Sequence, residues 1–519
     1  MTLFLMNSGQ ARARLVQAGA VFVAAALVAG CGSTYRPVVT PIGSSGPPAQ
    51  PIGAYAVVVS APSPTTAGIA TVIDYSGDTV LAYAPIGPGP SVFTLTESGT
   101  TGYTVNSDGT LSNIPISSQL QAKQITYSTL SSASQPAPPH PPVNMFSSVN
   151  GLWGADLTGN YADVFTGSPV AFHLAIPVAT TPVMIAGPPS TGQRNYAISQ
   201  DFDDFISGSS PNGVACNISP TTAPVNGEAD GIEISSLTLS SQIPVGLCPV
   251  YAVQSPDNRR LFVLNRGSGT VTVINSQDNT PDSCTPFQNQ NGHWITCHPS
   301  IALPAGPVYA EFSAATQQLV VANYDSNTIS IIDVSLDDFG NDFNTYENND
   351  CTTYAACGAI TGGFGTVYTV PVGNNPASVT VLNDGSRAYT ANQTDGTVTI
   401  VNLTSHTVEK TLPVIGHPRT VVSTQNSQFG KVYVASPDSP YITILRTDLD
   451  IVDTTILVEG NVVDVRVTSP NASGGSSNQT SRSPGHGQPC NLPLSDFAPT
   501  TSISLTLSNC QVQDVTLLQ

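Results

Sequence analysis

The sequence predicts an all-β fold in which similar four-stranded sheets repeat along one chain, an arrangement typical of a β-propeller. Val, Ile, Thr and Tyr dominate the ordered runs, and few windows show helical spacing. The chain holds 44 Gly and 43 Pro, which supply many tight turns. One stretch recurs four times without a gap, at residues 259–276, 317–334, 386–403 and 430–447.

The recurring stretch predicts a hairpin whose sheet is covered on both faces. Leu261 to Leu264 are four consecutive apolar residues. Because successive side chains of a strand point to opposite faces, this strand has no wet face. The following loop, "NRGSGT", and its sister loops "NYDSNT" and "NQTDGT" are rich in Gly and Asn, as hairpin turns with positive φ require. The unit is therefore a hairpin buried between neighbours.

A second motif marks the junction from one sheet to the next. It reads "IPVGLCP", "VPVGNNP" or "LPVIGHP", and its proline sets φ and withholds a donor where the chain leaves a ladder. Junctions of this kind end at Pro90, Pro182, Pro249, Pro307, Pro376, Pro418 and Asn461. Seven junctions predict seven blades. The interval from Pro85 to Pro177 is about twice the usual repeat and leaves room for an eighth.

The two ends of the repeat region predict how the ring closes. The first repeat contains "AYAVVV", "IATVIDY" and "TVLAYAP", three strands without an inner one. After the last junction, Val462 to Val467 stands where the other repeats place their inner strand. We therefore expect this C-terminal strand to complete the first blade, which removes the free sheet edges.

The motifs also carry a family resemblance. "LFVLN" and "LVVAN", followed by "GTVTVIN" and "NTISIID" and then by "VPVGNNP", resemble the YVTN-type propeller repeat. The resemblance covers roughly residues 54–467 and is strongest over 249–467. It implies a propeller of the lactonase-like or surface-layer type.

The N-terminus predicts export. Arg12 and Arg14 precede an apolar run from Ala18 to Gly30, which would rise about 20 Å as a helix, short of a bilayer core of roughly 30 Å. This pattern is typical of a secretory signal. Its end, "LVAGC", resembles the lipobox of bacterial lipoproteins and implies cleavage before a lipid-bearing Cys31, with outer-membrane sorting. The alternatives are an ordinary signal peptide or a short uncleaved anchor.

These features predict five segments. They are a lipoprotein signal peptide (1–30), a tether (31–53), the β-propeller (54–467), a low-complexity linker (468–489) and a C-terminal β-hairpin (490–519). The net charge of −19 disfavours nucleic acid as a partner, because the field of the protein repels phosphate. We expect a monomeric ring that meets the membrane through the lipid on Cys31 and binds a protein or a small molecule.

Eight cysteines remain beside Cys31, and an exported chain with an even number favours disulfides. They fall in near pairs, which suggests neighbour pairing, although many other connectivities are open. The pairs are Cys216 with Cys248, Cys284 with Cys297, Cys351 with Cys357, and Cys490 with Cys510.

Ligand-binding candidates lie on the face of the ring that carries the junctions, where propellers usually bind at the channel mouth. The candidates are Arg266, Asn323, Tyr324, Asp325, Asn374, Asn375, Asn392 and Asp395. The alternative is that these Asn and Asp residues only make turns.

Two residues suit hydrolysis. His417 could activate water and Arg419 could steady an oxyanion, and a lactonase-like hydrolase is the alternative function. The sequence shows neither a nucleophile elbow nor a third catalytic partner, so a binding or scaffolding module without a cofactor is the preferred prediction.

A weaker prediction concerns Ca²⁺. Asp337, Asp338, Asp342 and Glu347 lie in a loop rich in hard oxygen ligands, which would suit a Ca²⁺-dependent surface adhesion protein. The loop lacks EF-hand spacing, and a solvated acidic loop is the other reading.

Overall fold

The computed structural model describes a set of ranges between residues 54 and 468. The ranges are 54–96, 98–116, 123–126, 140–148, 151–167, 170–188, 192–201, 226–283, 287–288, 294–295, 297–336 and 363–468. The chain divides into two compact units, residues 1–38 and 39–519, and every described residue belongs to the second.

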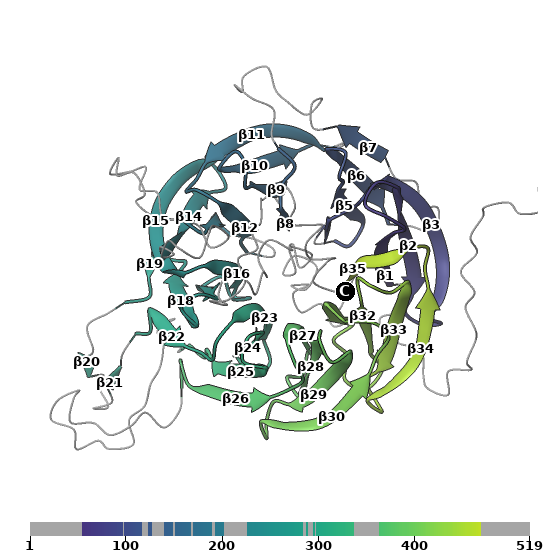
Figure 1. Ribbon diagram of the computed structural model, residues 1–519. Coiled ribbons are helices and arrows are strands. Elements are labelled where there is room, and N and C mark those ends of the chain that lie inside the picture. Colours follow the sequence, from purple (N-terminus) through teal and green to yellow (C-terminus); the bar gives the residue numbers. More distant parts are fainter. Residues whose placement is uncertain are drawn as a thin grey trace, which may run out of the picture. The chain divides into compact units, whose positions relative to one another are not determined.

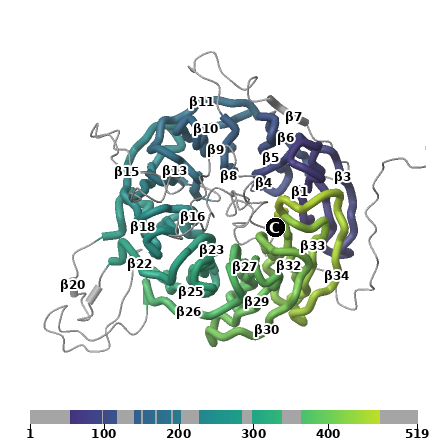
Figure 2. Tube along the Cα trace, in the orientation of Figure 1, coloured from purple at the N-terminus to yellow at the C-terminus, as the bar shows by residue number. Residues whose placement is uncertain are grey.

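Antiparallel four-stranded sheets, here called blades, follow one another around a ring in the second unit (Figures 1 and 2). Blade 1 contains β1 (Tyr55–Ala61), β2 (Ala67–Asp74), β3 (Thr79–Pro88) and β35 (Asn461–Val467). Blade 2 contains β4 (Val92–Leu95), β5 (Thr101–Val105), β6 (Thr110–Pro115) and β7 (Lys123–Thr126). Blade 3 contains β8 (Asn144–Ser148), β9 (Gly151–Asp156), β10 (Tyr161–Thr166) and β11 (Ala171–Pro177). Blade 4 contains β12 (Pro182–Ala186), β13 (Arg194–Ser199), β14 (Asn226–Glu233) and β15 (Thr238–Leu247).

The second half of the ring repeats the pattern. Blade 5 contains β16 (Pro249–Gln254), β17 (Arg260–Asn265), β18 (Thr270–Asn275) and β19 (Thr280–Pro281), with β22 (Ser300–Ala302) also paired to β18. Blade 6 contains β23 (Pro307–Ser313), β24 (Gln318–Asn323), β25 (Thr328–Asp333) and β26 (Val367–Pro371). Blade 7 contains β27 (Pro376–Val381), β28 (Arg387–Asn392), β29 (Thr397–Asn402) and β30 (Thr407–Pro413). Blade 8 contains β31 (Thr420–Ser423), β32 (Lys431–Ala435), β33 (Tyr441–Arg446) and β34 (Ile451–Leu457).

The ring is an eight-bladed β-propeller, so the prediction of seven blades is wrong and the eighth lies where the sequence left room for it. The long interval between Pro85 and Pro177 holds two complete blades, blade 2 and blade 3. Blade 2 ends with Thr126 and blade 3 begins with Asn144, so the chain passes from one blade to the next between these two residues. Counting junction motifs missed one blade because the connection from blade 2 to blade 3 does not carry the motif.

The predicted closure is confirmed. β35 pairs antiparallel with β1 and becomes the inner strand of blade 1, with Val465 opposite Val58 and Val467 opposite Ala56. The register shifts at Val59/Ser60, where a bulge admits one extra residue of β35. The ladder thus joins the first and last parts of the propeller, and blade 1 has no unpaired inner edge.

The expected burial of both sheet faces is also confirmed. Leu261, Phe262, Val263 and Leu264 of β17 are all at most 1% exposed. They belong to one large apolar cluster that runs through blades 4 to 7. Both faces of blade 5 are therefore covered by its neighbours, as the consecutive apolar residues require.

Blade 5 departs from the simple repeat at its outer edge. The position of the fourth strand is shared by β19, opposite Ile274 and Asn275, and by β22, opposite Thr270 to Thr272. Between them lies the short hairpin of β20 (Phe287–Gln288) and β21 (Trp294–Ile295). An insertion therefore splits the fourth strand without breaking its ladder.

Several predicted features fall outside the described residues: the signal segment with Cys31, the tether, the linker and the C-terminal hairpin. Of the cysteines, Cys248 and Cys297 are described, and both are disulfide-bonded. Their predicted pairing with Cys216 and Cys284 stays a prediction. No helix among the described residues is long and apolar enough to cross a membrane.

Candidate functional site

The face of the ring that carries the junctions, here called the junction face, combines two kinds of loop. One kind leads from the outer strand of a blade to the inner strand of the next, and the other joins the second and third strands within a blade. All eight predicted ligand-binding residues lie in these loops or at the strand ends beside them. The prediction of their common location is supported by this topology.

Two of these residues hold hairpins together. Asn323 ends β24, and its Nδ2 donates hydrogen bonds to the hydroxyls of Thr328 (3.1 Å) and Ser330 (2.9 Å) on β25. Asn392 makes the same pair of bonds in blade 7, and Asn265 makes it in blade 5. All three asparagines are fully buried. Their repeated role is to satisfy the end of a hairpin.

The glycine of the junction motif belongs to the same arrangement. A Cβ on Gly373 would lie 2.6 Å from Nδ2 of Asn392, and a Cβ on Gly246 would lie 2.7 Å from Cγ of Asn265. Both distances are too short for a real side chain. The "PVG" glycine is thus required because the buried asparagine at the end of the following blade's second strand packs directly on it.

A carboxylate in the hairpin loop fixes the junction loop beside it. Asp395 accepts hydrogen bonds from the backbone N–H (2.7 Å) and the side-chain amide (2.8 Å) of Asn374. In the next blade Asp438 does the same for His417, through the backbone N–H (2.8 Å) and Nδ1 (2.6 Å). His417 therefore occupies the place that Asn374 occupies one blade earlier.

The two hydrolytic candidates have different partners. The side chain of His417 is 45% exposed and paired with Asp438. Arg419 is buried, and its Nη2 donates to the backbone carbonyl of Val463 on β35 (3.1 Å). The structure thus directs His417 to the loop surface and Arg419 to the inner strand of blade 1.

The remaining candidates form a belt across blades 5, 6 and 7. Arg266 is buried, and its guanidinium donates to both carboxylate oxygens of Asp325, at 3.1 and 2.9 Å. Its Cζ lies 5.6 Å from the ring centre of Tyr324, whose hydroxyl donates to Gln393 (2.9 Å). Asn375 donates to the carbonyl of Tyr324 (3.2 Å). These contacts connect the loops of neighbouring blades through hydrogen bonds between the candidate residues themselves.

A second polar group lies on the inner strands, around the centre of the ring, and the sequence analysis did not single it out. This channel cluster consists of Tyr251 on β16, Tyr309 and Glu311 on β23, and Asp464 and Arg466 on β35. All five are at most 4% exposed. The rings of Tyr251 and Tyr309 are 4.7 Å apart between centroids and inclined by 39°.

The cluster joins opposite sides of the ring. β16 belongs to blade 5 and β35 to blade 1, which face each other across the centre (Figure 1). Burial raises the pKa of Tyr251 well above its usual value; Tyr309 and Glu311 raise it further, while the charge of Arg466 lowers it. The Tyr251 hydroxyl therefore stays protonated.

Hydrogen bonds hold the acidic members of the channel cluster. Glu311 Oε1 accepts from the backbone N–H of Val381 (3.2 Å) and from Nε2 of Gln425 (3.4 Å). Asp464 Oδ1 accepts from the hydroxyl of Thr420 (3.1 Å) and from the backbone N–H of Val465 (2.9 Å). Burial raises the pKa of Asp464, and the charges of Arg466 and Arg419 partly offset that effect.

The sequence contained one usable signal for this cluster. Glu311, Asp464 and Arg466 are charged residues within otherwise apolar inner strands, "VYAEF" and "VVDVRV". A charge in such a strand is buried, and buried charges are usually paired or functional. The convergence of the three could not be read from the chain, because it depends on how many blades separate them.

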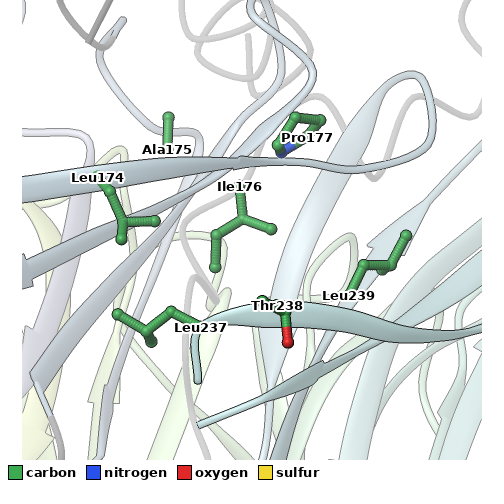
Figure 3. Close-up of a pocket in the computed structure, with 7 residues that line it drawn as sticks. All are labelled: Leu174, Ala175, Ile176, Pro177, Leu237, Thr238 and Leu239. Atoms are coloured by element: carbon green, nitrogen blue, oxygen red, sulfur yellow. The ribbon is translucent and has the colours of Figure 1, made fainter. Parts of the chain in front are cut away.

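Two other features carry no chemistry of their own. An apolar hollow of about 370 Å³ lies between β11 and β15, lined by side chains such as Leu174, Ile176, Leu237 and Leu239 (Figure 3). Among the described residues, no group of three or more His, Cys, Asp or Glu side chains is arranged to hold a metal. The predicted Ca²⁺ ligands Asp337, Asp338, Asp342 and Glu347 lie outside those residues.

Comparison with known proteins gives a fold and no family. No family model and no curated protein matches the chain. Among solved structures, AztD of Citrobacter koseri is 12% identical over 80% of this chain and 97% of its own, with a TM-score of 0.49. Dihydro-heme d1 dehydrogenase NirN, in complex with DHE, is 11% identical over 84% of this chain and 78% of its own, with a TM-score of 0.51. The similarity to NirN supports the β-propeller fold alone.

Proposed function

We propose that the protein is a YVTN-type β-propeller that binds a small molecule at the centre of its ring and has no catalytic role. The observation that carries this proposal is the channel cluster, in which two tyrosines, two carboxylates and an arginine are buried on the inner strands of three blades. A few polar groups converging in an otherwise apolar setting are typical of ligand sites. A channel filled by apolar side chains would instead have favoured protein contacts on a rim.

The junction face supports the same proposal from the other side. Its candidate residues are engaged with one another, as in the pairs Arg266–Asp325 and Asn374–Asp395. Because these side chains hold the loops in one conformation before a ligand binds, little conformational entropy is lost on binding. In this proposal the loops shape the channel mouth, and the inner strands supply the ligand contacts.

A ligand screen tests this function. The full-length protein would be melted with a panel of small molecules that differ in charge, next to the variant Tyr251→Phe/Tyr309→Phe. That variant keeps both rings and removes both hydroxyls. We expect at least one class of compound to raise Tm through binding to the folded state and to do so less in the variant. Equal shifts in both proteins, or none at all, would place the function elsewhere.

A second candidate function rests on His417 and Asp438. A histidine oriented by a carboxylate is the arrangement of a general base, and His417 is partly exposed. A lactonase-like hydrolase would use this pair. The matching pair of Asn374 and Asp395 in blade 7 favours a structural role instead, since asparagine cannot act as a base. Lactone turnover that disappears in His417→Ala would favour the hydrolase.

We further propose that the chain is exported and held at the bacterial envelope by a lipid on Cys31, in line with the lipobox-like "LVAGC". Labelling of cells with radioactive palmitate should mark the protein, and Cys31→Ala should abolish the label. Label that persists in Cys31→Ala would show that another residue carries the lipid.

A further inference from the structure

We propose that Arg466 forms a carboxylate-binding site at the centre of the ring, so that the ligand of the propeller is a small organic acid with a flat, partly apolar body. This inference rests on the proposed binding function and names the class of ligand.

The guanidinium of Arg466 is buried without its usual partners. Arg466 is 2% exposed. Within the described part of the chain, none of its three guanidinium nitrogens donates a hydrogen bond. It forms an ion pair with Asp464, whose Oδ2 lies 2.7 Å from Nη2. A buried guanidinium that keeps most of its donors unused is costly unless another acceptor completes it.

Two other arginines of this protein show how one carboxylate can pair with a guanidinium through two hydrogen bonds. Arg266 reaches Asp325 with Nε and Nη2 at 3.1 and 2.9 Å. Arg446 likewise donates to Asp448 through Nε (2.9 Å) and Nη2. In both cases one carboxylate takes two parallel hydrogen bonds. Arg466 lacks that arrangement because the other oxygen of Asp464, Oδ1, accepts hydrogen bonds from the Thr420 hydroxyl and the Val465 backbone N–H.

The charges around the site select a monoanion. Arg419 acts on Asp464 together with Arg466, so two cations and one carboxylate meet at β35. Glu311 adds a second carboxylate near Tyr251. Two cations and two carboxylates leave no net charge at the site, so a monoanion is accommodated more readily than a dianion such as phosphate, which the acids already present would repel. The planar fork of arginine also matches a carboxylate in geometry.

The tyrosines define the rest of the ligand. Tyr251 and Tyr309 lie in contact, with ring centroids 4.7 Å apart, on inner strands that face β35 across the centre of the ring. The site thus offers an aromatic wall beside a cation. An aromatic carboxylate satisfies both, because its ring packs on the tyrosines and its carboxylate meets Arg466.

Fluorine NMR on the purified full-length protein tests the site with two probes, 4-fluorobenzoate and its neutral analogue 4-fluorobenzamide. We expect the ¹⁹F signal of 4-fluorobenzoate to broaden or shift, and unlabelled benzoate to reverse the change. The amide should show no effect, and inorganic phosphate at the same concentration should not compete. If 4-fluorobenzoate shows no binding to the unmodified protein, or both probes bind alike, the inference is wrong.

The variant Arg466→Gln/Asp464→Asn removes both charges of the pair together and keeps the side-chain sizes similar. It should bind 4-fluorobenzoate about tenfold or more weakly, the loss expected for charge-assisted hydrogen bonds. The matched control is Arg446→Gln/Asp448→Asn, another arginine–aspartate pair two residues apart, which should leave binding unchanged. Equal binding in both double variants would overturn the assignment to Arg466.

The variant Arg466→Lys covers the case in which the double variant does not fold. It keeps the buried positive charge but loses the fork, so benzoate binding should still fall. Unchanged binding in Arg466→Lys would contradict the inference. A neutral or cationic compound that stabilises the protein through Tyr251 and Tyr309, with no benzoate bound, would leave the binding function standing and remove only the carboxylate ligand.

Discussion

Two seams of the ring are built from different chemistry. Between blades 5 and 6 the contact is apolar, and Phe262 lies 6.5 Å from Phe312 and 6.3 Å from Phe364 between ring centroids. Between blades 8 and 1, where the ring closes, Lys431 is buried between the carboxylates of Asp78 and Asp453. The first seam joins consecutive repeats, while Lys431 and Asp78 are 353 residues apart.

The two seams differ because each must bring its blades together in a different way. Consecutive blades are already adjacent through a short junction, so apolar area is enough to hold them. Blade 8 also continues through a short junction into β35, but the closing seam must then join this end of the chain to β1 and Asp78 at the other end. A buried ion pair penalises every wrong pairing that leaves a charge alone. Lys431 and Asp78 are themselves buried, and Tyr75 and Tyr433 pack together in an apolar cluster that joins blades 8 and 1.

The largest expected effect breaks the closing seam. Lys431→Met should lower the free energy of unfolding by about 3–5 kcal/mol, because it leaves two buried carboxylates without their cation. Urea or thermal unfolding would measure it. The triple variant with Asp78→Asn and Asp453→Asn should recover much of the loss. If the single variant is as stable as the unmodified protein, the ion pair does not hold the ring closed.

A pH series sharpens the comparison. Burial raises the pKa of Asp78 to about 6, although Lys431 works in the opposite direction. A carboxyl with a raised pKa in the folded state binds its proton more tightly there, so its contribution to stability falls as pH rises from about 4 to 6.

The stability difference between the unmodified protein and Asp78→Asn should therefore shrink or reverse over this range, by on the order of 2 kcal/mol. Denaturant unfolding at half-unit pH steps would record it. A difference that stays constant from pH 4 to pH 7 would mean that Asp78 keeps an ordinary pKa in the folded protein.

The apolar seam should respond differently. Phe262→Leu should cost about 1–2 kcal/mol, because it leaves a small cavity beside Phe312 and Phe364. The cost should be nearly the same at pH 4 and pH 7, since the three phenylalanine rings do not titrate, although the nearby imidazole of His298 contacts Phe364. Unfolding curves at both values would show this, and a clear pH dependence would mean that the two seams do not differ as described.

The smallest expected effect concerns a buried carboxyl group at the contact between blades 2 and 3. Asp163 of β10 is fully buried on the same strand face as Phe165, whose cluster joins blades 2 and 3. Neither carboxyl oxygen has a hydrogen-bond partner within the described chain. Burial raises the pKa of Asp163 well above its usual value, and the charge of Asp156 raises it further.

Asp163→Asn should therefore stabilise the protein at neutral pH by about 1 kcal/mol, because the amide avoids the cost of an uncompensated carboxylate. The gain should vanish at acidic pH, where Asp163 is protonated. Thermal melts at pH 4 and pH 7 would measure it. Loss of stability at pH 7 would indicate that the carboxylate is paired in solution.

The sequence alone determined what lies within one blade. Consecutive apolar residues such as Leu261 to Leu264 require cover on both faces, and this burial is local to a strand and its two neighbours. The closing strand could also be placed, because the first repeat lacked an inner strand and Val462 to Val467 supplied one. The recurring hairpin motif located the loops that begin at Asn323 and Asn392, though not the hydrogen bonds that those asparagines make.

Only the tertiary structure decided how many blades the ring has and what meets at its centre. The crossing from blade 2 to blade 3 lacks the junction motif, so counting motifs gave one blade too few. Tyr251, Glu311 and Arg466 come from blades 5, 6 and 1, and their meeting depends on the closed ring and its circumference. Strand patterns record which neighbours a residue has within its sheet, whereas contacts across a channel are set by the sum of all the angles between blades.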